Sequence, residues 1–157
     1  MKRAIFIDTW AFRALADGAD PSHAAARDLD QRLVEAGVAR VTTDYVLDEA
    51  LTGLRARGGR PVAVAFLDQV DALVAARRMS VERIGEARFR AAGAVFRRLD
   101  LPRLSFTDCT SFVVMREEKI AWAFTADAHF DRVGRDIRSA FALGKDGGPA
   151  VRELPFD

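Results

Sequence analysis

Three aspartates of the chain each come after a short apolar run of residues. They are Asp8 after the run 4–7, Asp108 after the run 104–106, and Asp127 after the run 120–124. If these runs are parallel strands, their carboxyl ends meet at one edge of a sheet, which is where open α/β sheets bind ligands. We therefore expect the three carboxylates to converge on a cleft.

Each aspartate taken alone also fits a purely structural role. Aspartate is favoured at the start of a helix, where it meets free backbone amides and the positive end of the helix dipole. Asp108 could close a capping box with Ser105. Three neighbouring carboxylates, however, repel one another and raise each other's pKa unless a cation neutralises them. A hard divalent ion such as Mg²⁺, bound by oxygen ligands, relieves that repulsion. Together the aspartates indicate a metal site, and they leave its substrate open.

Longer blocks around these aspartates resemble a known family. The blocks are Asp8-Thr9, Asp48-Glu49-Ala50-Leu51-Thr52, Ser105-Phe106-Thr107-Asp108-Cys109-Thr110-Ser111-Phe112 and Phe124-Thr125-Ala126-Asp127-Ala128-His129-Phe130. Their order and spacing, from residue 4 to around residue 134, are similar to those of PIN domains. The last two blocks resemble bacterial VapC-type toxins of type II toxin–antitoxin systems. The resemblance implies an acidic quartet that binds Mg²⁺ or Mn²⁺ and catalyses RNA cleavage: Asp8, Glu49, Asp108 and Asp127.

The helix pattern by itself does not select Glu49 for that quartet. Asp48 and Glu49 border the apolar stripe of their helix about equally, one on each side. The resemblance alone favours Glu49, and a solvated glutamate at the helix border is the alternative.

The resemblance implies a metal-dependent endoribonuclease that hydrolyses RNA phosphodiester bonds and is inhibited by a cognate antitoxin protein. A homodimer is also expected. The apolar helices 61–75 and 86–99 could supply its surface, although core packing explains their pattern equally well. Two alternatives stay open: a PIN nuclease of general RNA processing outside any toxin pair, and a non-cutting module that binds RNA or protein. A haloacid-dehalogenase phosphatase is excluded, because it needs a second aspartate where Trp10 stands.

Other polar residues near the blocks have weaker claims to the site. Asp131 could be a fifth acid, although a surface role is favoured. His23 and His129 have no histidine or cysteine partner at metal-ligand spacing. We expect His129 to pack or hydrogen bond near the rim of the cleft. Three hydroxyls fit helix caps by default, with contacts to a metal-bound water as the sharper alternative: Thr9, Thr107 and Ser111.

Strands and helices alternate among the elements that must position these residues. Besides the three runs above, strands are expected at 38–42 and 79–84. Helices are expected at 9–15, 21–36, 43–57, 61–75, 86–99 and 107–118. This order predicts a three-layer α/β/α sandwich with a central, mostly parallel sheet. We expect a single PIN-like nuclease domain over 1–157, with 134–157 an atypical C-terminal extension that holds a possible edge strand at 151–154.

The composition sets the remaining limits. Of the 157 residues, 50% are hydrophobic and 30% are charged, which is normal for a globular domain. No apolar run is long enough for a membrane span, and Asp8 interrupts the first run too early for a signal peptide. A single cysteine, Cys109, excludes an intrachain disulfide and favours a reduced, cytoplasmic location. Eight arginines gather between Arg77 and Arg103, and either phosphate binding or a solvated helix face explains them.

Overall fold

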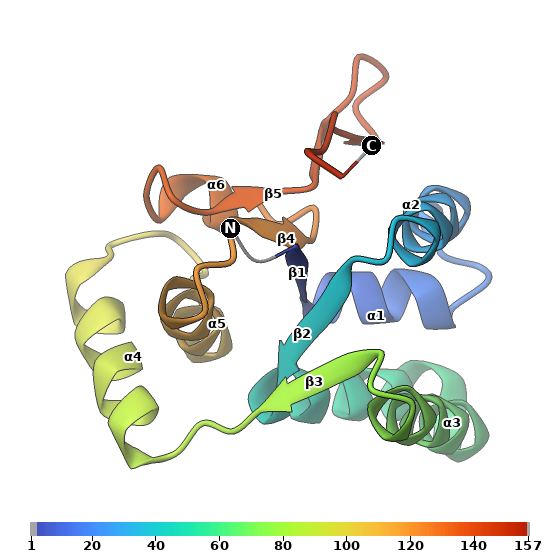
Figure 1. Cartoon of the computed structure of the whole chain (residues 1–157), viewed down its shortest axis with the longest axis horizontal. Coiled ribbons are helices and arrows are strands. Elements are labelled where there is room, and N and C mark those ends of the chain that lie inside the picture. Colours follow the sequence, from blue (N-terminus) through green and yellow to red (C-terminus); the bar gives the residue numbers. More distant parts are fainter. Residues whose placement is uncertain (1–2, 157) are drawn as a thin grey trace.

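The structure is a computed structural model that describes residues 3–156, and its centre is a five-stranded parallel sheet (Figure 1). The strands lie in the order β3-β2-β1-β4-β5. Their bounds are Ala4–Ile7 for β1, Ala39–Thr43 for β2, Met79–Glu82 for β3, Trp122–Phe124 for β4 and Arg138–Ser139 for β5. Strand β1 lies in the middle of the sheet and is buried at all of its positions. Burial on both faces explains why its sequence is continuously apolar rather than alternating.

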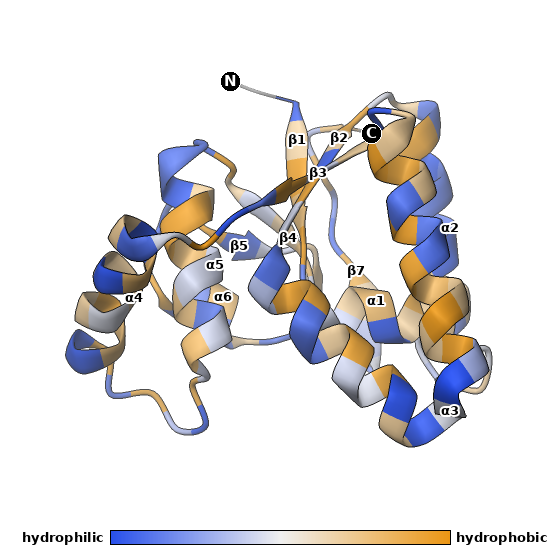
Figure 2. Cartoon of the chain, turned by 90° about the horizontal axis from the view of Figure 1, so that it is seen from below, coloured by the Kyte–Doolittle hydropathy of each residue, from blue (hydrophilic) through white to orange (hydrophobic). Residues whose placement is uncertain are grey.

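Helices cover both faces of the sheet, as Figures 1 and 2 show. On one side lie α1 (Thr9–Ala16), α2 (His23–Glu35) and α3 (Asp44–Ala75). On the other lie α4 (Glu86–Arg98), α5 (Phe106–Glu117) and the short α6 (His129–Arg132). The hydropathy colours of Figure 2 alternate around the helices, as expected for elements with one buried face. The predicted three-layer α/β/α sandwich is confirmed.

Helix α3 contains the break that the sequence predicts between 43–57 and 61–75. Gly59 has a φ of 79° and a ψ of −179°, a conformation that glycine adopts readily because it lacks a Cβ. Pro61 follows in the first turn of the second half, where its missing N–H costs no helical hydrogen bond. The two predicted helices are therefore halves of one kinked element.

The predicted strand at 104–106 is wrong. Leu104 N donates to Leu101 O at 3.2 Å and closes a turn. Ser105 is then the N-cap of α5, and its Oγ accepts from Asp108 N at 2.9 Å. In return Asp108 Oδ2 accepts from Ser105 N at 3.1 Å, which completes the capping box. These local hydrogen bonds place the run at a helix start, and β5 takes the sheet edge beside β4.

The segment after α6 extends the sheet and then forms a hairpin. Strand β5 pairs with β4, whereas β6 (Phe141–Leu143) and β7 (Pro149–Val151) pair only with each other and are antiparallel. The predicted edge strand at 151–154 is therefore wrong, and the edge strand of this extension lies at 138–139 instead. The apolar residues Leu154 and Phe156 are buried in the core rather than used for strand pairing.

Two sets of contacts attach this extension to the rest of the fold. The buried ring of Phe141 lies 4.9 Å from the ring of Trp10 and 5.6 Å from that of Phe124, centre to centre. The guanidinium of Arg152 donates to both carboxylate oxygens of Asp131, at 3.1 and 2.9 Å. The extension thus packs directly behind strand β4 and helix α1. No helix within residues 3–156 is both long enough and apolar enough to span a membrane.

Candidate functional site

The four acidic residues named from the sequence line one cavity of about 340 Å³. Each comes from a different place in the fold: the end of β1, the second turn of α3, the first turn of α5 and the loop after β4. The cavity is lined by Asp8, Thr9, Trp10, Arg13, Glu49, Arg103, Ser105, Asp108, Ala126 and Asp127. Residues far apart in the sequence thus form a single acidic cleft at the carboxyl end of the sheet.

Asp8 occupies the N-cap position of α1, yet its side chain makes no capping hydrogen bond. It is 4% exposed, and its Oδ2 accepts from Thr125 Oγ1 at 2.8 Å. Thr125 Oγ1 also accepts from Asp127 N at 3.0 Å. One hydroxyl therefore holds the Asp8 carboxylate beside the Asp127 backbone. Sequence reasoning missed Thr125, and the available signal was its position two residues before an aspartate, where a hydroxyl can bind that backbone N–H.

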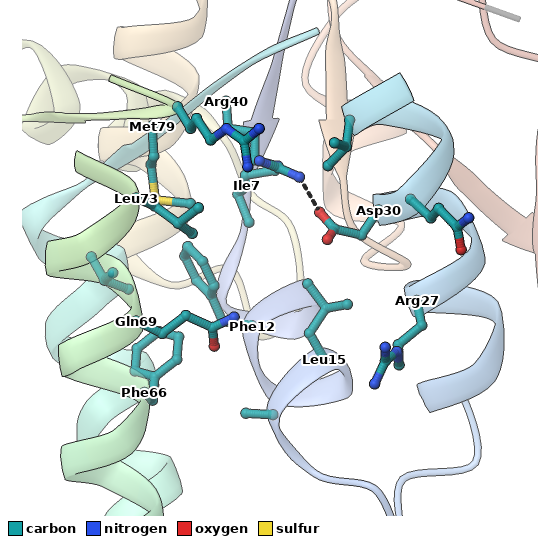
Figure 3. Close-up of a pocket in the computed structure, with 15 residues that line it drawn as sticks. Ile7, Phe12, Leu15, Arg27, Asp30, Arg40, Phe66, Gln69, Leu73 and Met79 are labelled. Atoms are coloured by element: carbon teal, nitrogen blue, oxygen red, sulfur yellow. Dashed lines mark hydrogen bonds and ion pairs between the residues drawn. The ribbon is translucent and has the colours of Figure 1, made fainter. Parts of the chain in front are cut away.

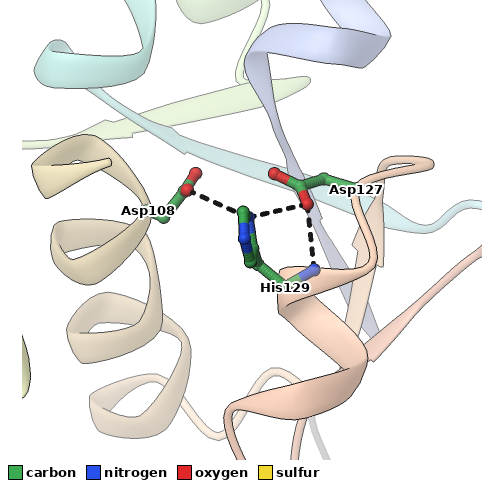
Figure 4. A group of neighbouring side chains, drawn as sticks. All are labelled: Asp108, Asp127 and His129. Carbon is green, nitrogen blue, oxygen red and sulfur yellow. Dashed lines mark hydrogen bonds and ion pairs between the residues drawn. The ribbon is translucent and has the colours of Figure 1, made fainter. Parts of the chain in front are cut away.

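Asp108 and Asp127 face His129 across the cleft (Figure 4). A ligand atom from each of the three lies within 4.8 Å of the other two. His129 Nδ1 is 2.9 Å from Asp127 Oδ1 and 3.7 Å from Asp108 Oδ2, and it has no partner with hydrogen-bond geometry among the described residues. Its Nε2 lies 2.8 Å from Pro102 O. Since a carbonyl oxygen only accepts, Nε2 carries a hydrogen. Nδ1 faces the carboxylates, and in the neutral ring it would offer a lone pair to a cation bound between them.

His129 therefore hydrogen bonds at the rim of the cleft, as the sequence predicts. Its ring also offers a third atom that could bind a metal ion, beside the two carboxylates, which was not predicted from the sequence. The backbone N of His129 donates to Asp127 Oδ1 at 2.9 Å, so the same residue fixes the orientation of that carboxylate.

Burial is the main cause of the raised pKa values of two acids in the cleft, Asp8 and Asp108. It raises the pKa of Asp8 to about 7, with the negative charge of Asp108 adding to the effect. It also raises the pKa of Asp108 to about 6, with the charge of Asp127 adding and the hydrogen bonds from Ser105 opposing. Burial lowers the pKa of His129, but its bond to the Pro102 carbonyl and the charge of Asp127 raise it more. Burial therefore disfavours the ionised form of Asp8 and Asp108, and a bound cation would stabilise it.

Oxygen donors of this kind suit Mg²⁺ and Mn²⁺. Asp8 and Asp108 are buried and Asp127 is half-buried, whereas the exposed Glu49 lines the same cavity from α3. Its neighbour Asp48 does not line the cavity. The structure therefore separates two acids that the helix pattern leaves equivalent.

Among the other residues named from the sequence, Thr9 lies at the cleft and others form contacts elsewhere in the fold. Thr9 lines the cavity, and its buried hydroxyl has no hydrogen-bond partner among the described residues. Ser111 Oγ instead donates to Thr107 O at 3.0 Å, within helix α5. His23 Nδ1 lies 2.8 Å from Ala14 O, outside the cleft. Asp131 binds Arg152 and accepts from Ser139 N at 3.0 Å, so it secures the extension rather than joining the acids.

The arginines between Arg77 and Arg103 are not equally free to bind phosphate. Arg88 donates to Glu117 at 2.7 Å and to Glu82 at 3.0 Å, which engages its guanidinium in the fold. Of the eight, Arg103 lines the acidic cavity.

A second cavity, of about 440 Å³, lies between α1, α2 and α3 and contains none of the four acids (Figure 3). Its walls combine apolar side chains, such as those of Phe12 and Phe66, with polar ones, such as those of Arg27 and Gln69. Arg40 is 7% exposed there and binds Asp30 at 2.8 Å. Helix α1 separates the two cavities, because residues 9, 10 and 13 face the acidic one and residues 12, 15 and 16 face the second one.

Comparisons with known proteins agree with this geometry. The family model of the PIN domain matches residues 5–136. The chain is 33% identical, over 134 residues, to the 23S rRNA-specific endonuclease VapC20 of Mycobacterium tuberculosis, covering 83% of this chain and 94% of that protein. The crystal structure of M. tuberculosis VapC20, described as a sarcin–ricin loop cleaving toxin, matches with a TM-score of 0.71 at 31% identity, covering 83% of this chain and 95% of that one. VapBC2 from Rickettsia felis, bound to a promoter DNA fragment, shares the fold with a TM-score of 0.62 at 14% identity, over 87% and 96% of the two chains.

Proposed function

The chain belongs to the PIN-domain family, and from this premise we propose that it is a metal-dependent endoribonuclease of the VapC toxin type, acting in the cytoplasm. Its catalytic and metal-binding residues are Asp8, Glu49, Asp108 and Asp127. The observation that carries the proposal is that these four acids, far apart in the sequence, surround one cavity.

The side chains around the cavity support hydrolysis of a phosphodiester bond. Bound Mg²⁺ or Mn²⁺ would lower the pKa of a water and stabilise the charge on the leaving oxygen. Thr125 orients Asp8, and the capping box orients Asp108. Because each of these two carboxylates is held by a hydrogen bond before substrate arrives, little reorganisation is needed during the reaction.

For the substrate we propose ribosomal RNA, specifically a loop like the sarcin–ricin loop. The support is the similarity to VapC20, which spans 94% of that protein and is accompanied by a structural match.

The partner of such a nuclease is a cognate antitoxin. The four carboxylates of the cleft outnumber its two arginines, so an arginine of the partner can enter it, pair with two carboxylate oxygens and compete with the cation. Apolar side chains of the same partner segment could pack on Phe12, Phe66 and Leu73 in the second cavity, on the other side of α1. A segment that is disordered alone can cover both surfaces as it folds on binding.

A homodimer is the proposed assembly. The rings of Phe89 and Phe96 on α4 are 51% and 48% exposed, and both pack against Phe106 at the start of α5. Tyr45 adds a fourth ring to this aromatic patch. Contiguous exposed aromatic surface favours contact with another protein surface. A second copy bound here would bring two acidic clefts close together, because Phe106 precedes Asp108 by two residues.

The first experiment is cleavage of a sarcin–ricin hairpin RNA by the purified protein. We expect cutting with Mg²⁺ or Mn²⁺ and none with EDTA. Removing even an outer partner of a metal ligand typically costs 10–100-fold, so Asp8→Asn or Glu49→Gln should reduce the rate by about a hundredfold or more. Asp48→Asn is the matched control, since it removes a charge one residue away from Glu49 and outside the cavity. Undiminished cutting by Asp8→Asn would overturn the assignment.

The second experiment separates a toxin from a general RNA-processing nuclease. Expression of the chain alone should arrest growth, and coexpression of the small protein encoded beside it should restore growth. Asp8→Asn should abolish the arrest. A chain that cuts RNA well in vitro and is harmless in cells belongs to RNA processing instead.

A further inference from the structure

Two arginines stand inside a cleft whose other charged side chains are all acidic. Arg13 is on α1, one turn after Thr9, and Arg103 is in the loop between α4 and α5. Residues three and four positions apart share a helix face, so Thr9, Trp10 and Arg13 line the cavity together. Binding of a metal ion by the four acids does not require these guanidinium groups.

Arg13 is held in place without using its hydrogen-bonding capacity. Among residues 3–156, its buried Nε has no hydrogen-bond partner and no carboxylate lies within ion-pair distance of its guanidinium. The side chain runs along α3 at Gly53, where a Cβ would lie 3.8 Å from Arg13 Cδ. Gly53 is one turn beyond Glu49 on the same helix. A cation at the wall of the cleft thus lacks the partner that a structural arginine would have.

Arg103 reaches the same cleft through an unusual backbone conformation. Its φ is 62°, in the left-handed region that residues other than glycine rarely adopt. Two hydrogen bonds hold the turn: Leu104 N donates to Leu101 O at 3.2 Å, and His129 Nε2 donates to Pro102 O at 2.8 Å. Strained residues of this kind persist where the surrounding structure fixes them, and they concentrate at functional sites.

We infer that Arg13 and Arg103, with the Thr9 hydroxyl, form a phosphate-binding site of the cleft that holds the RNA backbone next to the four acids. The inference rests on the proposed nuclease function and adds the residues that bind the substrate. RNA brings further negative charge to four carboxylates, so a site without cations of its own would repel it. A guanidinium group suits this task, because it stays charged and its planar N–H fork matches two phosphate oxygens.

The test measures binding without cleavage. A fluorescent sarcin–ricin hairpin is titrated with protein in EDTA at several KCl concentrations. Arg13→Met keeps much of the length of the side chain and removes its charge, and Arg103→Met does the same at the loop. The control is Arg60→Met, an exposed arginine at the kink of α3, beyond Gly59. It changes the net charge equally and lies outside the cavity.

We expect Arg13→Met to weaken hairpin binding about tenfold, the size expected for one charge-assisted hydrogen bond to phosphate. The slope of log affinity against log salt should fall by about 0.7–0.9 for each phosphate that the variant no longer neutralises. Arg13→Lys should keep most of that slope and recover only part of the affinity, because it restores the charge without the planar fork. Arg103→Gly should also weaken binding, while its melting temperature stays at or above the wild-type value because glycine relieves the left-handed backbone.

The possible outcomes distinguish failure of the phosphate-binding site from failure of the proposed nuclease function. If wild type neither binds nor cuts the hairpin, the proposed function has failed. If wild type binds and cuts while Arg13→Met and Arg103→Met keep its affinity and salt slope, the phosphate site is overturned and the nuclease stands. If Arg13→Met lowers only the melting temperature in EDTA, Arg13 merely neutralises the empty acidic cleft, and the inference is likewise overturned.

Discussion

Replacing Asp8 by asparagine should stabilise the metal-free protein at pH 8. The Asp8 carboxyl group is 4% exposed, and burial raises its pKa from 3.8 to about 7. An acid whose pKa is higher in the folded state binds more protons there than in the unfolded chain, so stability is lost as the pH rises between the two values. For Asp8 that window extends from 3.8 to about 7. Asparagine carries no charge and avoids the loss.

The size of the effect follows from the two pKa values. Each step of one in pKa corresponds to 1.36 kcal/mol, so the difference between 3.8 and about 7 corresponds to about 4 kcal/mol. The asparagine oxygen can still accept from Thr125, but the new amide hydrogens are buried and cost about 1–2 kcal/mol where they lack partners. We therefore expect a net gain of about 2 kcal/mol at pH 8, falling to zero or below near pH 4.

Urea and thermal unfolding in EDTA from pH 4 to 8 measure this gain. A difference of about 2 kcal/mol is roughly 4–8 °C in melting temperature for a chain of this size. The exposed Asp48→Asn is the control and should show no pH-dependent gain. Added Mg²⁺ should stabilise wild type more than Asp8→Asn, because the ion binds the native acids. A gain that is absent at pH 8, or of equal size at pH 4, refutes the assignment of a strained buried carboxylate.

Three further predictions concern the extension and the aromatic patch. Phe141→Ala, which empties a buried ring site against Trp10, should reduce the free energy of unfolding by about 3–5 kcal/mol, and Phe141→Leu by much less; equal unfolding curves would contradict this packing. Arg152→Met should cost about 1 kcal/mol in urea unfolding, and it should cost nothing further once Asp131→Asn is present, since both remove one partly exposed ion pair. Phe96→Glu should convert the proposed dimer to a monomer in sedimentation experiments, and an unchanged dimer would place the interface elsewhere.

The rule that ligands bind at the carboxyl ends of parallel strands predicts part of the site. Asp8 and Asp127 lie where the carboxyl-end rule for parallel sheets places them, after β1 and β4. Asp108 reaches the same cleft by a different route, from the first turn of α5, because the capping box with Ser105 outweighs the apolar character of 104–106. The expected position was right although the expected strand was wrong.

The other parts of the site depend on contacts that no local pattern encodes. Glu49 and Asp48 are equivalent on their helix border, and only the packing of α3 against the sheet decides which one faces the cleft. Thr125 binds Asp8 across 117 positions of sequence. Strand β5 has two residues, too few for a visible alternation, and it exists because Ser139 and its neighbours complete the edge beside β4.

The order of synthesis along the chain determines when the acidic cleft can form, because Asp127 is the last of its four acids to be made. A chain is synthesised from its N-terminus, and a domain generally folds as a unit. Asp8, Glu49 and Asp108 emerge first, whereas Asp127 and the residues that pack behind it, Phe141 and Phe156 among them, emerge last. The acidic cleft is therefore complete only after synthesis has passed Asp127 and the residues that pack behind it. If ribosomal RNA is the substrate, the translating ribosome meets no complete acidic cleft on its own product before that point.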